Sequence, residues 1–186
     1  MSNEQISSEE FRSFAGEFKN ESDRAAVVLA AAKLDYLLRA TLECFLMPCS
    51  TGDDELLDAD RPLSTFSARI NITARLGLIT PDLARALHLV RKIRNSFAHE
   101  HGGVSLAAGP HRDRLDALVQ PMQANWAFKF MLTYFDGLET PGTLFRGAVA
   151  LLMLRLSGLA DHVKQVDSGT QQGLFPKGPD PAETTS

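Results

Sequence analysis

The chain has 186 residues and a formal net charge of −4 at pH 7, and its 44% hydrophobic and 23% charged residues are typical of one soluble globular domain. No uncharged apolar run is long enough to cross a bilayer, and the polar N-terminal sequence MSNEQISSEEF does not resemble a secretory signal. Two cysteines, Cys44 and Cys49, are too few for a disulfide scaffold or a four-cysteine zinc site. We therefore expect a cytoplasmic protein that uses no metal, no cofactor and no membrane.

The charge is unevenly distributed along the chain. Residues 1–60 hold 13 acidic and 5 basic residues, whereas residues 61–114 hold 3 acidic and 9 basic ones. The whole-chain charge argues against bulk nucleic-acid binding, although the central segment could present a local basic patch. The interpretation that we favour is that these bases pair with the acidic N-terminal third inside one domain.

Helical periodicity dominates the first hundred residues. Serine and threonine N-caps at Ser22, Ser64 and Thr80 mark helix starts, and Pro48 and Gly77 mark ends. The loop between Pro48 and the next helix is acidic, with room for one helical turn. The helices predicted here span residues 8–19, 22–47, 63–77 and 81–99.

The second half of the chain is also predicted to be helical. A short helix over 111–119 precedes the aromatic-rich segment 121–138, where helix is favoured over strand, and a long helix covers 143–166. The tail 168–186 is rich in proline and glycine and has little to bury, so we expect it to be disordered. The fold class is therefore an all-α, single-domain helical bundle over residues 10–166, between a flexible N-terminus (1–9) and a disordered tail (167–186). Its core should come from 22–47, 64–77, 81–99 and 143–166.

An arginine falls on the apolar stripe of the predicted 81–99 helix. On a helical wheel, Arg94 lies within roughly 20° of Leu83, among the bulky apolar positions. A buried guanidinium needs a carboxylate, a set of carbonyls or a second subunit as its partner. Asp35 of the 22–47 helix is the candidate carboxylate, so we predict a structural ion pair between Arg94 and Asp35. The alternative is that Arg94 binds an anion such as phosphate, with His99 as a general acid or base.

Residues 94–99, RNSFAH, resemble the R-N-x-x-x-H signature of HEPN domains. That family is all-helical and usually dimeric, and many members are metal-independent ribonucleases. The resemblance implies that Arg94 would stabilise a phosphate, that His99 would act as acid or base and that Asn95 would assist them. RNA would be the partner under this alternative. A regular helix separates Arg94 and His99 by roughly 140°, so they would need a frayed helix end or a second subunit.

A longer resemblance covers about residues 10–120. Three segments, 22–46, 56–79 and 87–100, resemble the mannitol operon repressor family, and the run PLSTFSARI with its spacing to RKIRNSFAH is the most specific part. This resemblance implies an all-helical transcriptional regulator that works through a partner protein and has no DNA-binding motif of its own. A homodimer is compatible with it.

The residues themselves agree on one point. The best helix-turn-helix candidate, 64–77 followed by 81–99, has a second helix that begins PDLARALHL, which is too apolar to face a DNA groove. We therefore expect no direct specific DNA binding, and a regulator rather than an enzyme, with the ribonuclease as the alternative.

Overall fold

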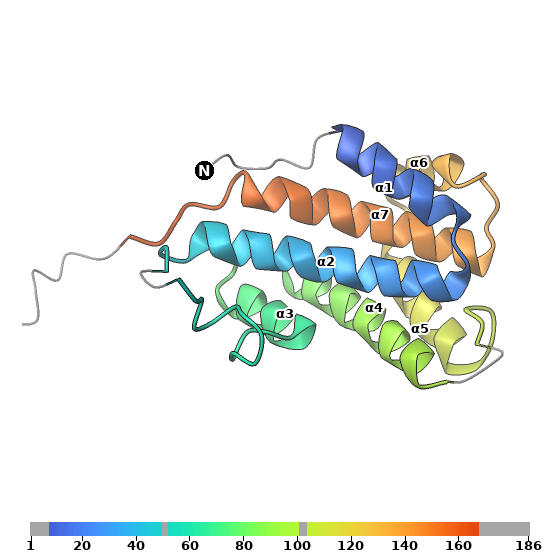
Figure 1. The fold of residues 1–186 in the computed structure, drawn as a ribbon. Helices are drawn as coiled ribbons and strands as arrows, with labels where there is room; N and C mark the ends of the chain where they lie inside the picture. The colour runs from blue at the N-terminus through green and yellow to red at the C-terminus, as the bar shows by residue number, and fades with distance from the viewer. Residues whose placement is uncertain (1–7, 50–51, 101–103, 168–186) are drawn as a thin grey trace, which may run out of the picture.

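The computed structural model describes residues 8–49, 52–100 and 104–167, and within them 69% helical content without strands confirms the all-α prediction (Figure 1). Residues 1–7 and 168–186, where we predicted flexible ends, lie outside the described residues, and Ser8 already belongs to the first helix. The elements in chain order are α1 (Ser8–Asn20), α2 (Asp23–Phe45), α3 (Phe66–Arg75), α4 (Pro81–His99), α5 (Gly109–Val119), the 3-10 turn η1 (Gln120–Met122), α6 (Trp126–Tyr134) and α7 (Pro141–Ala160).

The helix starts follow the capping signals closely. Ser22 and Thr80 cap α2 and α4 as predicted, and each side-chain oxygen accepts a backbone N–H three residues on. The cap of α3 is Thr65 rather than Ser64, so that helix begins one residue later than its cap signal indicated. Gly77 follows α3 with a φ of +72°, a left-handed conformation that favours glycine.

Three helices are clearly shorter than predicted, and the first is α3, which covers Phe66–Arg75 instead of 63–77. The aromatic segment is helical only from Trp126 to Tyr134, and α7 ends at Ala160 instead of continuing to residue 166. After α7 the chain turns back to the end of α2, where the Val166 N–H donates to the Phe45 carbonyl at 2.8 Å. That contact replaces the last turns of the predicted helix.

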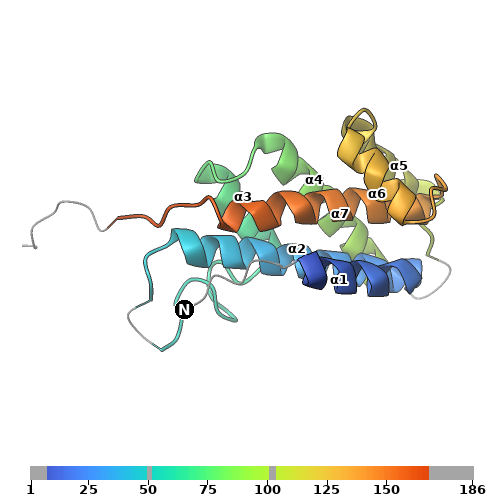
Figure 2. The same cartoon turned by 90° about the horizontal axis from the view of Figure 1, so that it is seen from above.

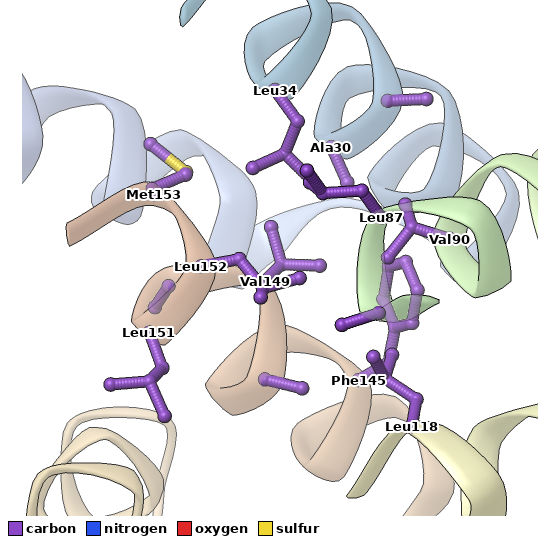
Figure 3. Close-up of a cluster of buried hydrophobic side chains, with 14 of the residues drawn as sticks. Ala30, Leu34, Leu87, Val90, Leu118, Phe145, Val149, Leu151, Leu152 and Met153 are labelled. Carbon is purple, nitrogen blue, oxygen red and sulfur yellow. The ribbon is translucent and has the colours of Figure 1, made fainter. Parts of the chain in front are cut away.

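α2 and α7 run side by side in the same direction and form the centre of the bundle, and α7 lies between α2 and α6 (Figures 1 and 2). Figure 3 shows side chains from α2, α4, α5 and α7 meeting in one apolar cluster. The core therefore includes α5 and α6 as well as the four predicted helices. By length and composition alone, α7 is long and apolar enough to cross a membrane. In this fold, however, 56% of its most apolar 18-residue stretch is buried inside the protein.

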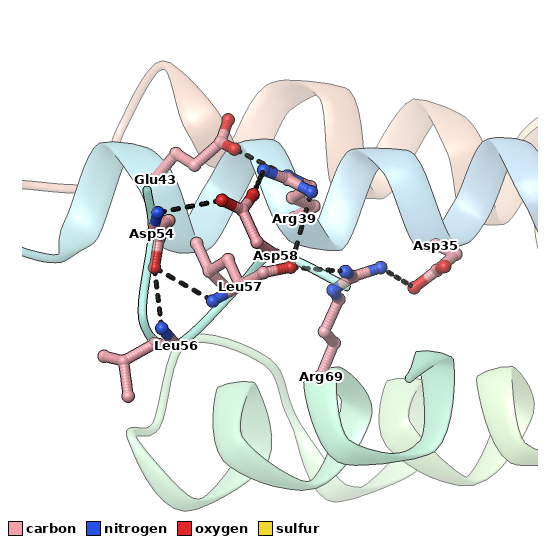
Figure 4. Close-up of polar contacts among 8 residues, drawn as sticks. All are labelled: Asp35, Arg39, Glu43, Asp54, Leu56, Leu57, Asp58 and Arg69. Atoms are coloured by element: carbon pink, nitrogen blue, oxygen red, sulfur yellow. Dashed lines mark hydrogen bonds and ion pairs between the residues drawn. The ribbon is translucent and has the colours of Figure 1, made fainter. Parts of the chain in front are cut away.

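Two buried arginines hold the helices in place. Arg146 of α7 donates to the Phe18 and Glu21 carbonyls and to Asp23, and so fixes α7 against the α1–α2 turn. Arg69 of α3 is only 6% exposed; it donates to Asp35 of α2 at 2.8 Å and to the Leu57 carbonyl at 3.1 Å (Figure 4). Each guanidinium therefore joins segments that are distant in sequence.

The acidic loop between α2 and α3 is fastened beside Arg69. Arg39 of α2 donates to Glu43, Asp58 and the Leu57 carbonyl, and the Asp54 carboxylate accepts the Leu56 and Leu57 N–H groups (Figure 4). The Asp54 N–H and then Arg39 hydrogen-bond to the Asp58 carboxylate and lower its pKa below the ordinary value. The loop is therefore held to α2 by specific polar contacts.

Replacing Arg69 tests this arrangement. We expect Arg69→Met to lower the free energy of unfolding by about 3 kcal/mol, because in a largely buried site Asp35 loses its guanidinium partner and the Leu57 carbonyl loses one of its two arginine donors. The matched control Arg94→Met should change it by less than about 0.5 kcal/mol, because Arg94 is exposed. Urea unfolding of both variants measures the difference, and equal losses would contradict the assignment of the buried role to Arg69.

Candidate functional site

The predicted ion pair between Arg94 and Asp35 is wrong. Among the described residues, Asp35 pairs with Arg69, whereas the Arg94 guanidinium is exposed and donates to the neighbouring Asn95 Oδ1 at 3.1 Å. Asp35 does pair with a buried arginine, but that arginine is Arg69 and not Arg94. Asp35 and Arg94 nevertheless line one and the same groove.

The reason lies in how α4 is packed along its length. Ala84 and Leu87 are buried near its start, whereas Ile93 and Phe97 are buried near its end, so the buried face turns around the helix axis. A helical wheel assumes that the buried face keeps one direction along the whole helix, and it therefore places Arg94 on the buried face. Near the start of α3, Arg94 is exposed.

A groove lies at that place between α2, the start of α3 and the second half of α4. Its volume is about 470 Å³, and its polar lining includes Arg91, Arg94 and Asn95 of α4. One turn before Arg91, His88 shares a hydrogen bond of 3.0 Å with Asn71 of α3. Burial, and then the positive charges of Arg91 and Lys92, lower the pKa of His88 below its ordinary value.

The third predicted site residue, His99, does not join this groove. It is exposed in the last turn of α4 and is absent from the groove lining. Its neighbours have structural roles: Ser96 accepts from Arg114, and the Glu100 carboxylate contacts the His111 ring nitrogen at 3.1 Å. One chain therefore brings Arg94 and Asn95 together but leaves His99 apart from them.

A second candidate surface consists of exposed aromatic and aliphatic side chains on α6 and the turn after it. Trp126 is 78% exposed, Phe130 62% and Tyr134 42%, and Leu138 beyond the helix is 63% exposed. The opposite side of the same helix, with Phe128 and Leu132, packs against α7 in the core. Side chains of this size are rarely left exposed in a row on a monomer.

Beside this row, two hollows meet along α7. The first, about 490 Å³, is mostly apolar and lies between the first half of α4, the end of α5 and the second half of α7. The other, about 570 Å³, lies between α7 and the start of α6 at Trp126. Leu151, Arg155 and Leu159 line both hollows, so the two form one surface. This surface and the exposed row Trp126, Phe130, Tyr134 and Leu138, of which Trp126 lines the second hollow, are together called the α6–α7 face.

Comparison of the chain with protein-family models, with curated proteins and with solved structures found no match.

The α6–α7 face was not identified from the sequence as a site, although a signal for it exists. The aromatic residues of 121–138 were recognised as a group, but not divided by helix face. Trp126, Phe130, Tyr134 and Leu138 recur at every fourth residue, whereas Phe128, Leu132 and Phe135 follow the other face. An apolar helix with two separate apolar faces predicts that one face packs in the core and that the other is available to a partner.

Proposed function

We propose that this chain is a regulatory protein that acts by binding another protein, as the resemblance to the mannitol operon repressor family implies, without reading DNA itself. The observation that supports this proposal is the exposed row Trp126, Phe130 and Tyr134 on α6, whose first member lines the hollow between α6 and α7. Aromatic side chains supply much of the binding energy at protein interfaces, because they bury a large area at a low entropic cost.

The charges around the α6–α7 face favour a particular kind of partner. Arg85 and Arg155 are exposed at the apolar hollow between α4, α5 and α7 and form no ion pair among the described residues, and the acidic residue in the lining is Asp82. An apolar hollow with unpaired arginines fits an amphipathic helix that has acidic residues at the edges of its apolar face. We propose such a helix, supplied by the partner protein, as the occupant.

Two substitutions on α6 test the proposal in cells. The double variant Trp126→Ala, Phe130→Ala should fold normally, because both side chains are exposed, and should lower partner recovery after crosslinking by about tenfold or more. It should also reproduce the transcript changes of a deletion strain. The matched control is Tyr36→Ala, an exposed aromatic of α2 outside both hollows.

The measurements are quantitative mass spectrometry of the crosslinked complex and transcript profiling at matched protein levels. A double variant that keeps the wild-type transcript profile would contradict the proposal. So would a Tyr36→Ala variant that loses the partner equally.

A HEPN-type ribonuclease is the second candidate function, and one observation favours it. Arg94 and His99 are both exposed and therefore accessible to a substrate. They occupy faces of one regular helix that lie roughly 140° apart, so joint chemistry would require Arg94 from one copy and His99 from another.

RNA cleavage in the presence of EDTA separates the two candidates. Under the leading proposal, we expect the purified protein to leave single-stranded RNA intact, because no single chain brings the arginine and the histidine together. Arg94→Ala, His99→Ala and the control Arg75→Ala should melt within a few degrees of the wild type. Wild-type cleavage that is lost in the first two variants and kept in the third would make the ribonuclease the better account.

A further inference from the structure

The groove between α2, α3 and α4 carries an excess of positive charge that the described residues do not neutralise. Arg91 is partly buried, and its Nε is buried without a hydrogen-bond partner among the described residues. The only hydrogen bond of the Arg94 side chain within the described residues goes to the neutral Asn95. Two guanidinium groups thus line one concave surface without a carboxylate partner.

The one acidic residue in the groove does not cancel these charges. Asp35 also lines it, but its carboxylate pairs with the buried Arg69 at 2.8 Å. Partial burial of an unpaired charge is unfavourable, and a bound anion would relieve this cost for Arg91. The groove therefore has the electrostatic character of an anion site.

The opposite wall of the groove adds neutral hydrogen-bond donors. Ser64, Thr65 and Ser67 line it where α3 begins, and the hydroxyls of Ser64 and Ser67 have no partner among the described residues. The Thr65 hydroxyl caps α3 by accepting the Ala68 N–H. The Phe66 and Ser67 N–H groups at the helix start have no partner within the helix and remain as further donors. These donors complement the two arginines, because a phosphate accepts several hydrogen bonds at once.

The size and the remaining walls of the groove indicate what the anion is attached to. At about 470 Å³ the groove is in the range of small-molecule sites and is larger than an inorganic ion needs. Val28, Ala31 and Ala32 of α2 and Phe66 of α3 supply an apolar wall. The ligand should therefore carry a compact organic part next to its anionic group.

We propose that this groove binds a small phosphomonoester, with Arg91 and Arg94 contacting the phosphate and Ser64 and Ser67 donating to it. The dianionic phosphate matches the two unpaired guanidinium groups in charge. The site does not depend on the α6–α7 face, so it goes beyond the proposed docking function.

Binding of defined probes to the full chain tests the proposal. The probes are inorganic phosphate, glycerol phosphate, glycerol and a single-stranded RNA oligonucleotide without terminal phosphates, each titrated by calorimetry and by amide chemical shifts. We expect both phosphates to bind saturably, with shifts at the start of α3 and in the second half of α4, and glycerol not to bind.

Charge-removing variants assign the binding to the groove. Arg94→Gln and Arg91→Gln should each weaken glycerol phosphate binding by about tenfold or more, because each removes a charge-assisted contact. The control Arg75→Gln, an exposed arginine of α3 outside the groove, should bind as the wild type does. Circular dichroism and a thermal melt establish that each variant is folded.

Three results would overturn the proposal. The first is the absence of saturable phosphate binding by the folded wild type, and the second is equal weakening in Arg75→Gln. The third is Arg94-dependent binding of the RNA without binding of glycerol phosphate, which would assign the groove to RNA instead.

Discussion

The arrangement of α2, α3 and α4 depends on the hydrogen bonds of one buried side chain, the guanidinium of Arg69. By binding Asp35 of α2 and the Leu57 carbonyl of the preceding loop, it fixes where α3 begins relative to α2. The groove that contains Arg91 and Arg94 lies between that start, α2 and α4. Arg69 also pairs with the Asp35 carboxylate, which would otherwise neutralise the positive charge of that groove. The ion pair between Arg69 and Asp35 thus leaves two other arginines, Arg91 and Arg94, available to a ligand.

The two candidate surfaces use different parts of the same bundle. The α6–α7 face is apolar, involves the first half of α4 and suits a partner helix, whereas the groove is cationic, involves the second half of α4 and suits a small anion. The single helix α4 thus contributes its first half to one surface and its second half to the other.

The sequence predicted the helices better than the site, for physical reasons. Caps and proline positions act locally, and so Ser22, Thr80 and the break after α2 were found. The end of α7 depends on a contact between Val166 and Phe45, residues that are far apart in sequence, and a periodic pattern cannot reveal it. Arg94 was misplaced because the buried face of α4 turns along the helix. The pairing of Asp35 with Arg69 required knowledge of which helix packs beside α2.

Site-specific photo-crosslinking in cells tests the central claim, that the α6–α7 face docks a partner protein. A photoreactive phenylalanine analogue replaces Phe130 in one strain and Tyr36, an exposed aromatic outside the face, in another. The account predicts one defined crosslinked protein from position 130 and not from position 36, joined through a peptide with acidic residues beside an apolar helix face. Equal crosslinking from both positions, a crosslink only to a second copy of this chain, or none from position 130 would contradict it.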